Sequence, residues 1–336
     1  MSDARVTIYN NLGASPTEII PALERVSWRL NETGEAVFSI PYEAAGPDVI
    51  KLGNRVLIEF SNGLPNWGGV IDVPLGQRDN GIPVQAAQDD RLLSWRYTGN
   101  TEAYIDTRGN VAGDIVTAGN AVYPTGLVSY EIESAGETMT LVHHYTQLLS
   151  AIRDLTDAQD YDILPVIVGG QLQLRLYWYE ERGGDKSDTV LLEHGKNVTA
   201  CSLDWVGSLS NYITVVGGSG DWSGRTVKTA SDSDSINAYG RREKVLITSD
   251  ISDATTLQAV ADAYLAANKD PHVQATLTSV DRLPAEFEDY DVGDVVTLAA
   301  YLDRGNWAFQ GDVRIISRQW NARDDTCTLE VKQWRS

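Results

Sequence analysis

Histidines are the residues of this sequence with the clearest capacity for metal chemistry. His143 and His144 are adjacent, whereas His194 and His272 are isolated, so no two of them are spaced to bind a metal from one face of a helix. The sequence also lacks the glycine-rich loops that bind phosphate and the nucleophile elbow of serine hydrolases. These patterns predict no metal site, no cofactor and no catalytic residue.

Acidic pairs are a weaker indication of chemistry. A glycoside hydrolase needs two carboxyl groups at a set separation, and adjacent acids occur at positions 89–90, 180–181 and 324–325. The chain has 47 acidic residues, so adjacency carries little information, and we interpret these pairs as solvated surface or turn residues. Residues 231–235 alternate serine and aspartate but lack the glycine and terminal glutamate of a calcium-binding loop, which favours a mobile loop.

Net charge restricts the partners of the chain. The 47 acidic residues against 27 basic ones give a formal charge of −20, the opposite of what a phosphate-neutralising protein needs, so general nucleic-acid binding is excluded. No run approaches about 18 apolar residues and no secretory signal begins the chain, which predicts a soluble protein without a membrane anchor. Cys201 and Cys327 lie on predicted strands and could face one another, although buried thiols are the default for a protein made in a cytoplasm.

The first two parts of the chain differ in their elements. Residues 1–97 alternate apolar and polar positions between turn sequences such as the asparagine-glycine pair at 62–63, which predicts antiparallel strands. Residues 98–200 contain a helical spacing at 146–155 and then a hairpin at 163–178, which indicates an α+β segment.

Strand patterns return in residues 201–336. They are interrupted by residues 217–240, whose glycine, serine and aspartate content predicts an exposed loop, and by a helix at 254–268, which Asp253 caps. We therefore predict a mainly β fold with an α+β insertion. Two related small β-barrel domains, 1–97 and 201–336, flank a middle α+β domain at 98–200.

The two barrels are related through an internal repeat. An apolar residue and a glycine turn at Gly53 begin a strand, and the same pattern occurs at Gly293. A second glycine follows in each case, at Gly69 and at Gly311, and each opens a further strand. We predict these four glycines as structural turns of a duplicated unit, although two antiparallel meanders can also look alike because hairpin geometry allows few solutions.

Ordered segments of the chain carry a resemblance to a known family. They are residues 26–41, 53–60, 67–70, 191–198, 211–217, 235–240 and the terminal region from Val292. In these segments the sequence resembles the tail-hub proteins of tailed bacteriophages, the group that includes baseplate hubs and tail-associated hub proteins. The resemblance covers most of the chain and rests on the order of the segments.

The resemblance implies a homotrimeric ring of barrels in the virion, at the tail tip or baseplate, assembled in the host cytoplasm. The expected neighbours are a distal tail protein or tube ring above, tip, fibre or spike proteins below, and a tape-measure protein in the lumen. DNA is expected as a repelled passenger during ejection, and the chain is not expected to be an enzyme. Because the sequence stops at Ser336, directly after the second barrel, tube-plugging, fibre-bearing and wall-degrading roles are expected of other subunits.

Two other functions stay open from the residues alone. One is a wall-degrading hydrolase domain in the middle region. The other is a carbohydrate-binding adhesion module that uses Trp222 and other aromatic residues of the segment 217–240.

Overall fold

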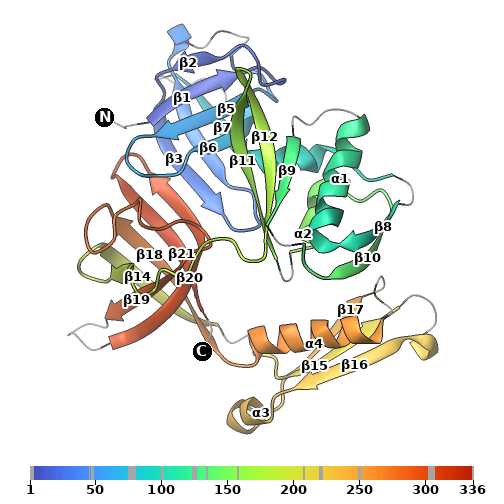
Figure 1. The fold of residues 1–336 in the computed structure, drawn as a ribbon. Coiled ribbons are helices and arrows are strands. Elements are labelled where there is room, and N and C mark those ends of the chain that lie inside the picture. The colour runs from blue at the N-terminus through green and yellow to red at the C-terminus, as the bar shows by residue number, and fades with distance from the viewer. Residues whose placement is uncertain are drawn as a thin grey trace.

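The chain is mainly β, as its strand patterns predict (Figure 1). The computed structural model describes residues 4–334 except for positions 45, 47–48, 75–80, 100–101, 123–126, 134, 157–158, 207–208, 219–221, 249–250, 252 and 302–306. Within these residues, no helix is long and apolar enough to cross a membrane. Both cysteines, Cys201 and Cys327, are free thiols.

Most described strands form one curled sheet with two halves. The N-terminal half contains β1 (Ala4–Tyr9), β2 (Thr17–Ile19), β3 (Ala22–Arg29), β4 (Glu35–Ile40), β5 (Arg55–Phe60), β6 (Trp67–Pro74) and β7 (Ile82–Gln88). The C-terminal half contains β13 (Leu191–Glu193), β14 (Val198–Val206), β18 (His272–Val280), β19 (Val295–Tyr301), β20 (Trp307–Asn321) and β21 (Thr326–Gln333). The strand order is β14-β18-β21-β20-β3-β4-β7-β6-β5-β1-β2, and β13 pairs with β19 beside this path.

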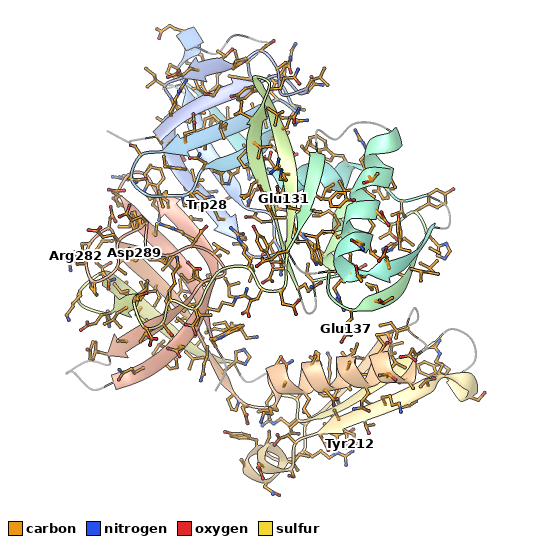
Figure 2. The ribbon with its side chains drawn as sticks, in the orientation of Figure 1. Trp28, Glu131, Glu137, Tyr212, Arg282 and Asp289 are labelled. Atoms are coloured by element: carbon orange, nitrogen blue, oxygen red, sulfur yellow. The ribbon has the colours of Figure 1, made fainter. Side chains whose placement is uncertain are left out.

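The two halves meet where β20 pairs with β3. The last five residues of β20, from Ser317 to Asn321, pair with Arg29 to Arg25 in antiparallel register. Trp28, labelled in Figure 2, is buried at this joint. The Phe60 ring contacts it in a tilted arrangement at a centroid distance of 5.7 Å and meets the Trp320 ring edge-on at 5.4 Å. One hydrophobic core runs through both halves, so the two predicted barrels share a sheet and a core.

The middle of the chain folds as an α+β segment with its own core. It contains β8 (Glu102–Thr107), α1 (Arg108–Val122), β9 (Leu127–Ile132), β10 (Thr138–His143), α2 (Leu148–Arg153), β11 (Asp160–Val168) and β12 (Gln171–Tyr179). β11 and β12 form the hairpin expected at 163–178, and α2 lies within the helical spacing at 146–155. The tip of the hairpin reaches the first half of the sheet, where the Leu172 N–H donates to the Gly13 carbonyl at 2.7 Å.

A second α+β unit is inserted between β14 and β18. It contains β15 (Tyr212–Gly217), β16 (Thr226–Ser231), α3 (Ser233–Tyr239), β17 (Glu243–Thr248) and α4 (Ala254–Asn268), which packs on the β16-β15-β17 sheet. The helix expected at 254–268 is α4, and Asp253 caps it through the Thr256 N–H at 2.8 Å.

The loop predicted at 217–240 is wrong in its described part, which contains β16 and α3. The Asp232 side chain accepts a hydrogen bond from the Ser235 N–H at 2.9 Å and caps α3, so residues 231–235 do not form a mobile loop either. Serine and aspartate favour both loops and helix caps, and the composition alone does not separate the two.

Candidate functional site

Two of the four glycines that the sequence assigns to turns lie in turns. Gly53 lies two residues before the start of β5 with a φ of +85°, and Gly293 lies two residues before the start of β19 with a φ of +97°. Gly69 and Gly311 instead lie inside β6 and β20, which corrects their assignment as turns. A side chain at Gly69 would collide with the Trp67 ring, so this glycine makes room for a core tryptophan.

The turn at Gly53 has a defined hydrogen-bond pattern. The Gly53 N–H donates to the Ile71 carbonyl at 3.0 Å, and the Ile71 N–H donates to the Asn54 carbonyl at 2.8 Å. Directly after Ile71, the pairing of β6 with β7 shifts register before Val73. The glycine turn, the return strand and the bulge therefore form one local unit.

The turn at Gly293 repeats this unit contact by contact. The Gly293 N–H donates to the Ile315 carbonyl at 2.8 Å, and the Ile315 N–H donates to the Asp294 carbonyl at 2.9 Å. The pairing of β20 with β21 shifts register directly after Ile315, before Ser317. Two segments far apart in sequence thus use the same backbone bonds and place the same bulge.

Whole strands follow the same correspondence. The N-terminal half runs β3-β4-β7-β6-β5 across the sheet, and the C-terminal half runs β14-β18-β21-β20-β19. Within each set of five strands, these are the first, second, fifth, fourth and third in chain order. The main difference lies between the first and second strands, which a short turn joins in one half and the inserted unit joins in the other.

A group of buried charged side chains lies where the parts of the chain meet, around Asp160 on β11. Its Oδ1 accepts from the Asn31 side chain at 2.7 Å, and its Oδ2 accepts from the Arg182 N–H at 2.8 Å and from the Arg314 guanidinium at 2.6 Å. Asn31 belongs to the β3–β4 turn and Arg314 to β20. One carboxylate therefore joins the first half of the sheet, the middle segment and the second half.

A second buried carboxylate, Asp90, fixes the same turn from another side. It follows β7 at the start of the 3-10 helix η2 (Asp89–Trp95), and its Oδ2 accepts from Thr33 at 2.9 Å, from Arg153 at 3.1 Å and from Tyr161 at 3.1 Å. Burial raises the pKa of Asp90, while Arg153 and the hydrogen bonds from Thr33 and Tyr161 act in the opposite direction. The β3–β4 turn is thus held to the middle segment at two points.

Asp89 is fully buried beside this group, and neither of its carboxylate oxygens has a hydrogen-bond partner within the described part of the chain. Burial raises its pKa well above the usual range, Arg55 opposes the shift, and Asp90 and Asp162 add to it. The interpretation of positions 89–90 as solvated is wrong, because both side chains are buried and the partners of Asp90 come from segments distant in sequence. Position 68 has room only for a glycine, since a side chain there would collide with the Asp89 carboxyl group.

The segment after β12 extends the network toward the second glycine turn. Asp162 forms an ion pair of 2.9 Å with Arg182, which is almost wholly buried. Asp294, in the turn after Gly293, accepts from the Gly184 N–H and forms an ion pair with Lys186, both at 2.8 Å. The repeated turn is therefore also an anchoring point for the chain that leaves the middle segment.

This arrangement is suited to holding parts together. The carboxylates of the network face arginine, lysine, amide and hydroxyl donors, so their charges are largely compensated where they lie. Among the described residues, no group of histidine, cysteine or acidic side chains is placed to hold a metal ion. No sequence signal singles out Asp160, whose partners Asn31 and Arg314 are 129 and 154 residues away.

The fold is that of solved bacteriophage tail proteins, and the expected resemblance to phage tail proteins is confirmed. Residues 185–333 match the family described as prophage endopeptidase tail. The prophage tail protein gp18 of Listeria monocytogenes EGD-e is 13% identical, with a TM-score of 0.66 over 99% of this chain and 95% of that one. The 43 kDa tail protein of prophage MuSo2 from Shewanella oneidensis is 13% identical, with a TM-score of 0.64 over 98% of both chains.

A tail protein from Neisseria meningitidis MC58 is similar to the same extent. It is 14% identical, with a TM-score of 0.63 over 98% of this chain and 96% of that one. No curated protein matches the sequence. At these identities, the likeness to solved structures establishes the fold.

Proposed function

We propose that this protein is a structural hub of a bacteriophage tail, a homotrimer whose two related barrels per subunit form a ring of six. The observation that carries the proposal is the repeated five-strand unit with its repeated glycine turn, hydrogen bonds and bulge. A duplicated unit lets one chain offer nearly equivalent docking surfaces at six positions with threefold symmetry. That is what a protein needs at the junction between a sixfold tube and a threefold tip.

We divide the chain into two barrels and a middle domain. The first barrel is residues 1–97, as the sequence predicts. The strand β13 pairs with β19, and the Lys186 N–H donates to the Val295 carbonyl at 2.8 Å, so residues from 185 onward pack with the second half. This supports a middle domain at 98–184 and a second barrel at 185–336, in place of a boundary at residue 200.

The buried network gives the hub its mechanical role. Asp160 and Asp90 hold one turn of the first barrel, the middle domain and the second barrel together through buried, charge-assisted contacts. A subunit fixed in this way transmits force between its neighbours without its domains shifting. Rigidity of the domain arrangement, not catalysis, is the property that we assign to this site.

The partners follow from the position. We expect a distal tail protein or tube ring above the hub, tip, fibre or spike proteins below it and a tape-measure protein in the lumen before ejection. The net charge of −20 suits a wall past which DNA moves, since lumenal carboxylates repel phosphates over about 8 Å at physiological salt. The protein then belongs to the virion and is assembled in the host cytoplasm.

Native mass spectrometry of the purified chain and electron cryo-microscopy of tails test this proposal. We expect a trimer and density for three copies at the distal end of the tail, with acidic side chains along the lumen. A chain that stays monomeric and is absent from virions overturns the hub proposal. A neutral or basic lumen overturns the electrostatic part alone.

A peptidase is the second candidate, because the matching family is described as prophage endopeptidase tail. Purified protein incubated with peptidoglycan distinguishes the two functions. We expect no release of soluble fragments beyond that of a buffer control. Release that scales with protein concentration and survives repeated purification assigns an enzymatic role.

A further inference from the structure

The two halves of the sheet differ in the strand pairing of β3 and of its counterpart β14. In the N-terminal half, β3 pairs with β4 on one side and with β20 on the other. In the C-terminal half, the corresponding strand β14 pairs with β18 and ends the sheet. Within the described part of the chain, its other edge is unpaired after Val198, which forms an isolated bridge with His194. One half therefore has a neighbour at a position where the other half has none.

The strand pairings identify which residues of the two halves correspond. Ile71 and Ile315 correspond through their identical turn bonds, and they pair with Ala86 and Val331, respectively. The next strand then matches Ala36 with Ala275, because Ala36 pairs with Ala86 and Ala275 with Val331.

One strand further, Val26 pairs with Ala36 and Leu203 pairs with Ala275, so Val26 and Leu203 correspond. Val26, which β20 covers, has no exposed surface, whereas Leu203 is only partly buried.

Among the described residues, the strand β6, which corresponds to β20, also lacks a neighbour at the position where β20 pairs with β3. Ser317 of β20 is 7% exposed because it lies at the joint with β3, opposite Arg29. Its counterpart two residues after Ile71 is Val73 of β6, an apolar side chain that is 42% exposed. An unpaired strand edge and an exposed valine thus occupy the two positions that the β3–β20 joint fills inside the chain.

We propose that the free edge of β14 pairs in antiparallel fashion with the end of β6 of a second copy of this chain. This inference rests on the proposed trimeric hub and names the surfaces that close it. The occupant is a second copy because the contact repeats, with corresponding residues, the joint that already connects the two halves within one chain. The contact is head to tail, and three such contacts close a ring. By correspondence with Arg29 and Ser317, Val206 of one copy lies opposite Val73 of the next.

Disulfide cross-linking between these two positions tests the register. Directly opposed residues of antiparallel strands lie about 4.5–5.5 Å apart, which a disulfide spans. We expect the full-length double variant Val73→Cys, Val206→Cys to give covalent trimers on a non-reducing gel after mild oxidation. A mixture of the two single variants should give covalent dimers, and each single variant alone should give neither.

A charge substitution tests the contribution of the surface, with a matched control. Val73→Asp places a carboxylate in the proposed contact, and we expect the dissociation constant of the trimer to rise at least about 100-fold. Val245→Asp makes the same change at a valine of similar exposure on β17, outside this contact, and should leave the trimer unchanged. Circular dichroism confirms that both variants fold.

The outcomes separate this inference from the hub proposal. Suppose that the parent chain is trimeric, that the double-cysteine variant does not cross-link, and that Val73→Asp leaves the dissociation constant of the trimer unchanged. The β14–β6 contact is then wrong and the hub proposal stands. If cross-links fail to form both in solution and in purified tails, the inference is likewise overturned. A Val73→Asp chain that stays trimeric yet is missing from tails assigns this surface to a different tail protein and also overturns it.

Discussion

Replacement of Asp160 tests the interdomain network most directly. In Asp160→Asn the side chain keeps its shape, but it loses its charge and its new amide nitrogen cannot accept a hydrogen bond. In the parent chain Oδ2 accepts from Arg182 and Arg314, and Oδ1 accepts from Asn31. Whichever way the new amide turns, its NH₂ group meets at least one donor, and Arg314 loses its nearest counter-charge.

The size of the effect follows from burial. The two side chains of the Asp160–Arg314 pair are only 8% and 11% exposed. Removing the charge of one partner of a buried pair costs about 3–5 kcal/mol, a range that already contains the lost hydrogen bond. We therefore expect the free energy of unfolding to fall by about 3–5 kcal/mol, a large part of the stability of a typical protein.

Urea denaturation, followed by tryptophan fluorescence and by circular dichroism, measures this loss. Agreement between the two probes shows whether a single transition is being compared. Glu18→Gln serves as the control, because it breaks the Arg5–Glu18 ion pair of 2.8 Å, whose side chains are more than half exposed and which contributes at most about 1 kcal/mol. If the two variants lose the same stability, Asp160 does not hold the parts of the chain together.

Two further predictions concern Asp89 and the glycine turns. Because burial raises the pKa of Asp89, the native chain keeps a proton that the unfolded chain releases above about pH 4. The free energy of unfolding therefore falls as pH rises from there toward the folded pKa. Asp89→Asn should lack this component in urea titrations between pH 4.5 and 8, and parallel pH profiles would contradict it. Gly293→Ala should cost more than the roughly 1–2 kcal/mol of left-handed strain, because its Cβ would lie 2.5 Å from the Arg182 carbonyl oxygen. Gly53→Ala, with its nearest contact at 4.0 Å, should show that strain alone, and Gly184→Ala should show neither. Equal losses in all three variants would refute the reasoning.

The sequence predicts correctly those elements that interactions between neighbouring residues determine. The alternation of the hairpin at 163–178 and the helical spacing and caps of 254–268 are properties of adjacent residues, and both elements formed as expected. The helix α1 was not predicted, because its glycines and asparagines have low helix propensity. Buried residues of that helix, such as Val111 and Ile115, pack into the core of the middle segment, and this tertiary burial outweighs propensity.

The buried network was beyond prediction for a different reason. Asp90 and Arg153 are 63 residues apart, and an acidic pair among 47 acids carries no mark of burial. Their environment is fixed only once a turn, a 3-10 helix and an α-helix meet. The repeat was visible in the sequence, but Gly69 and Gly311 were matched by spacing. Register shows that Gly69, opposite Val56, corresponds to Val313, opposite Val296.

The repeat also explains where the two halves of the chain diverge. In the first half, the turn between the first two strands presents Asn31 and Thr33 to the buried carboxylates of Asp160 and Asp90. In the second half, the same connection carries the inserted unit with α3 and α4. Two five-strand units that differ mainly at this one connection keep similar sheet edges, as the proposed ring contacts require. In the ring of six barrels that we propose, two kinds of attachment alternate, so that sixfold docking surfaces combine with threefold symmetry in a single chain.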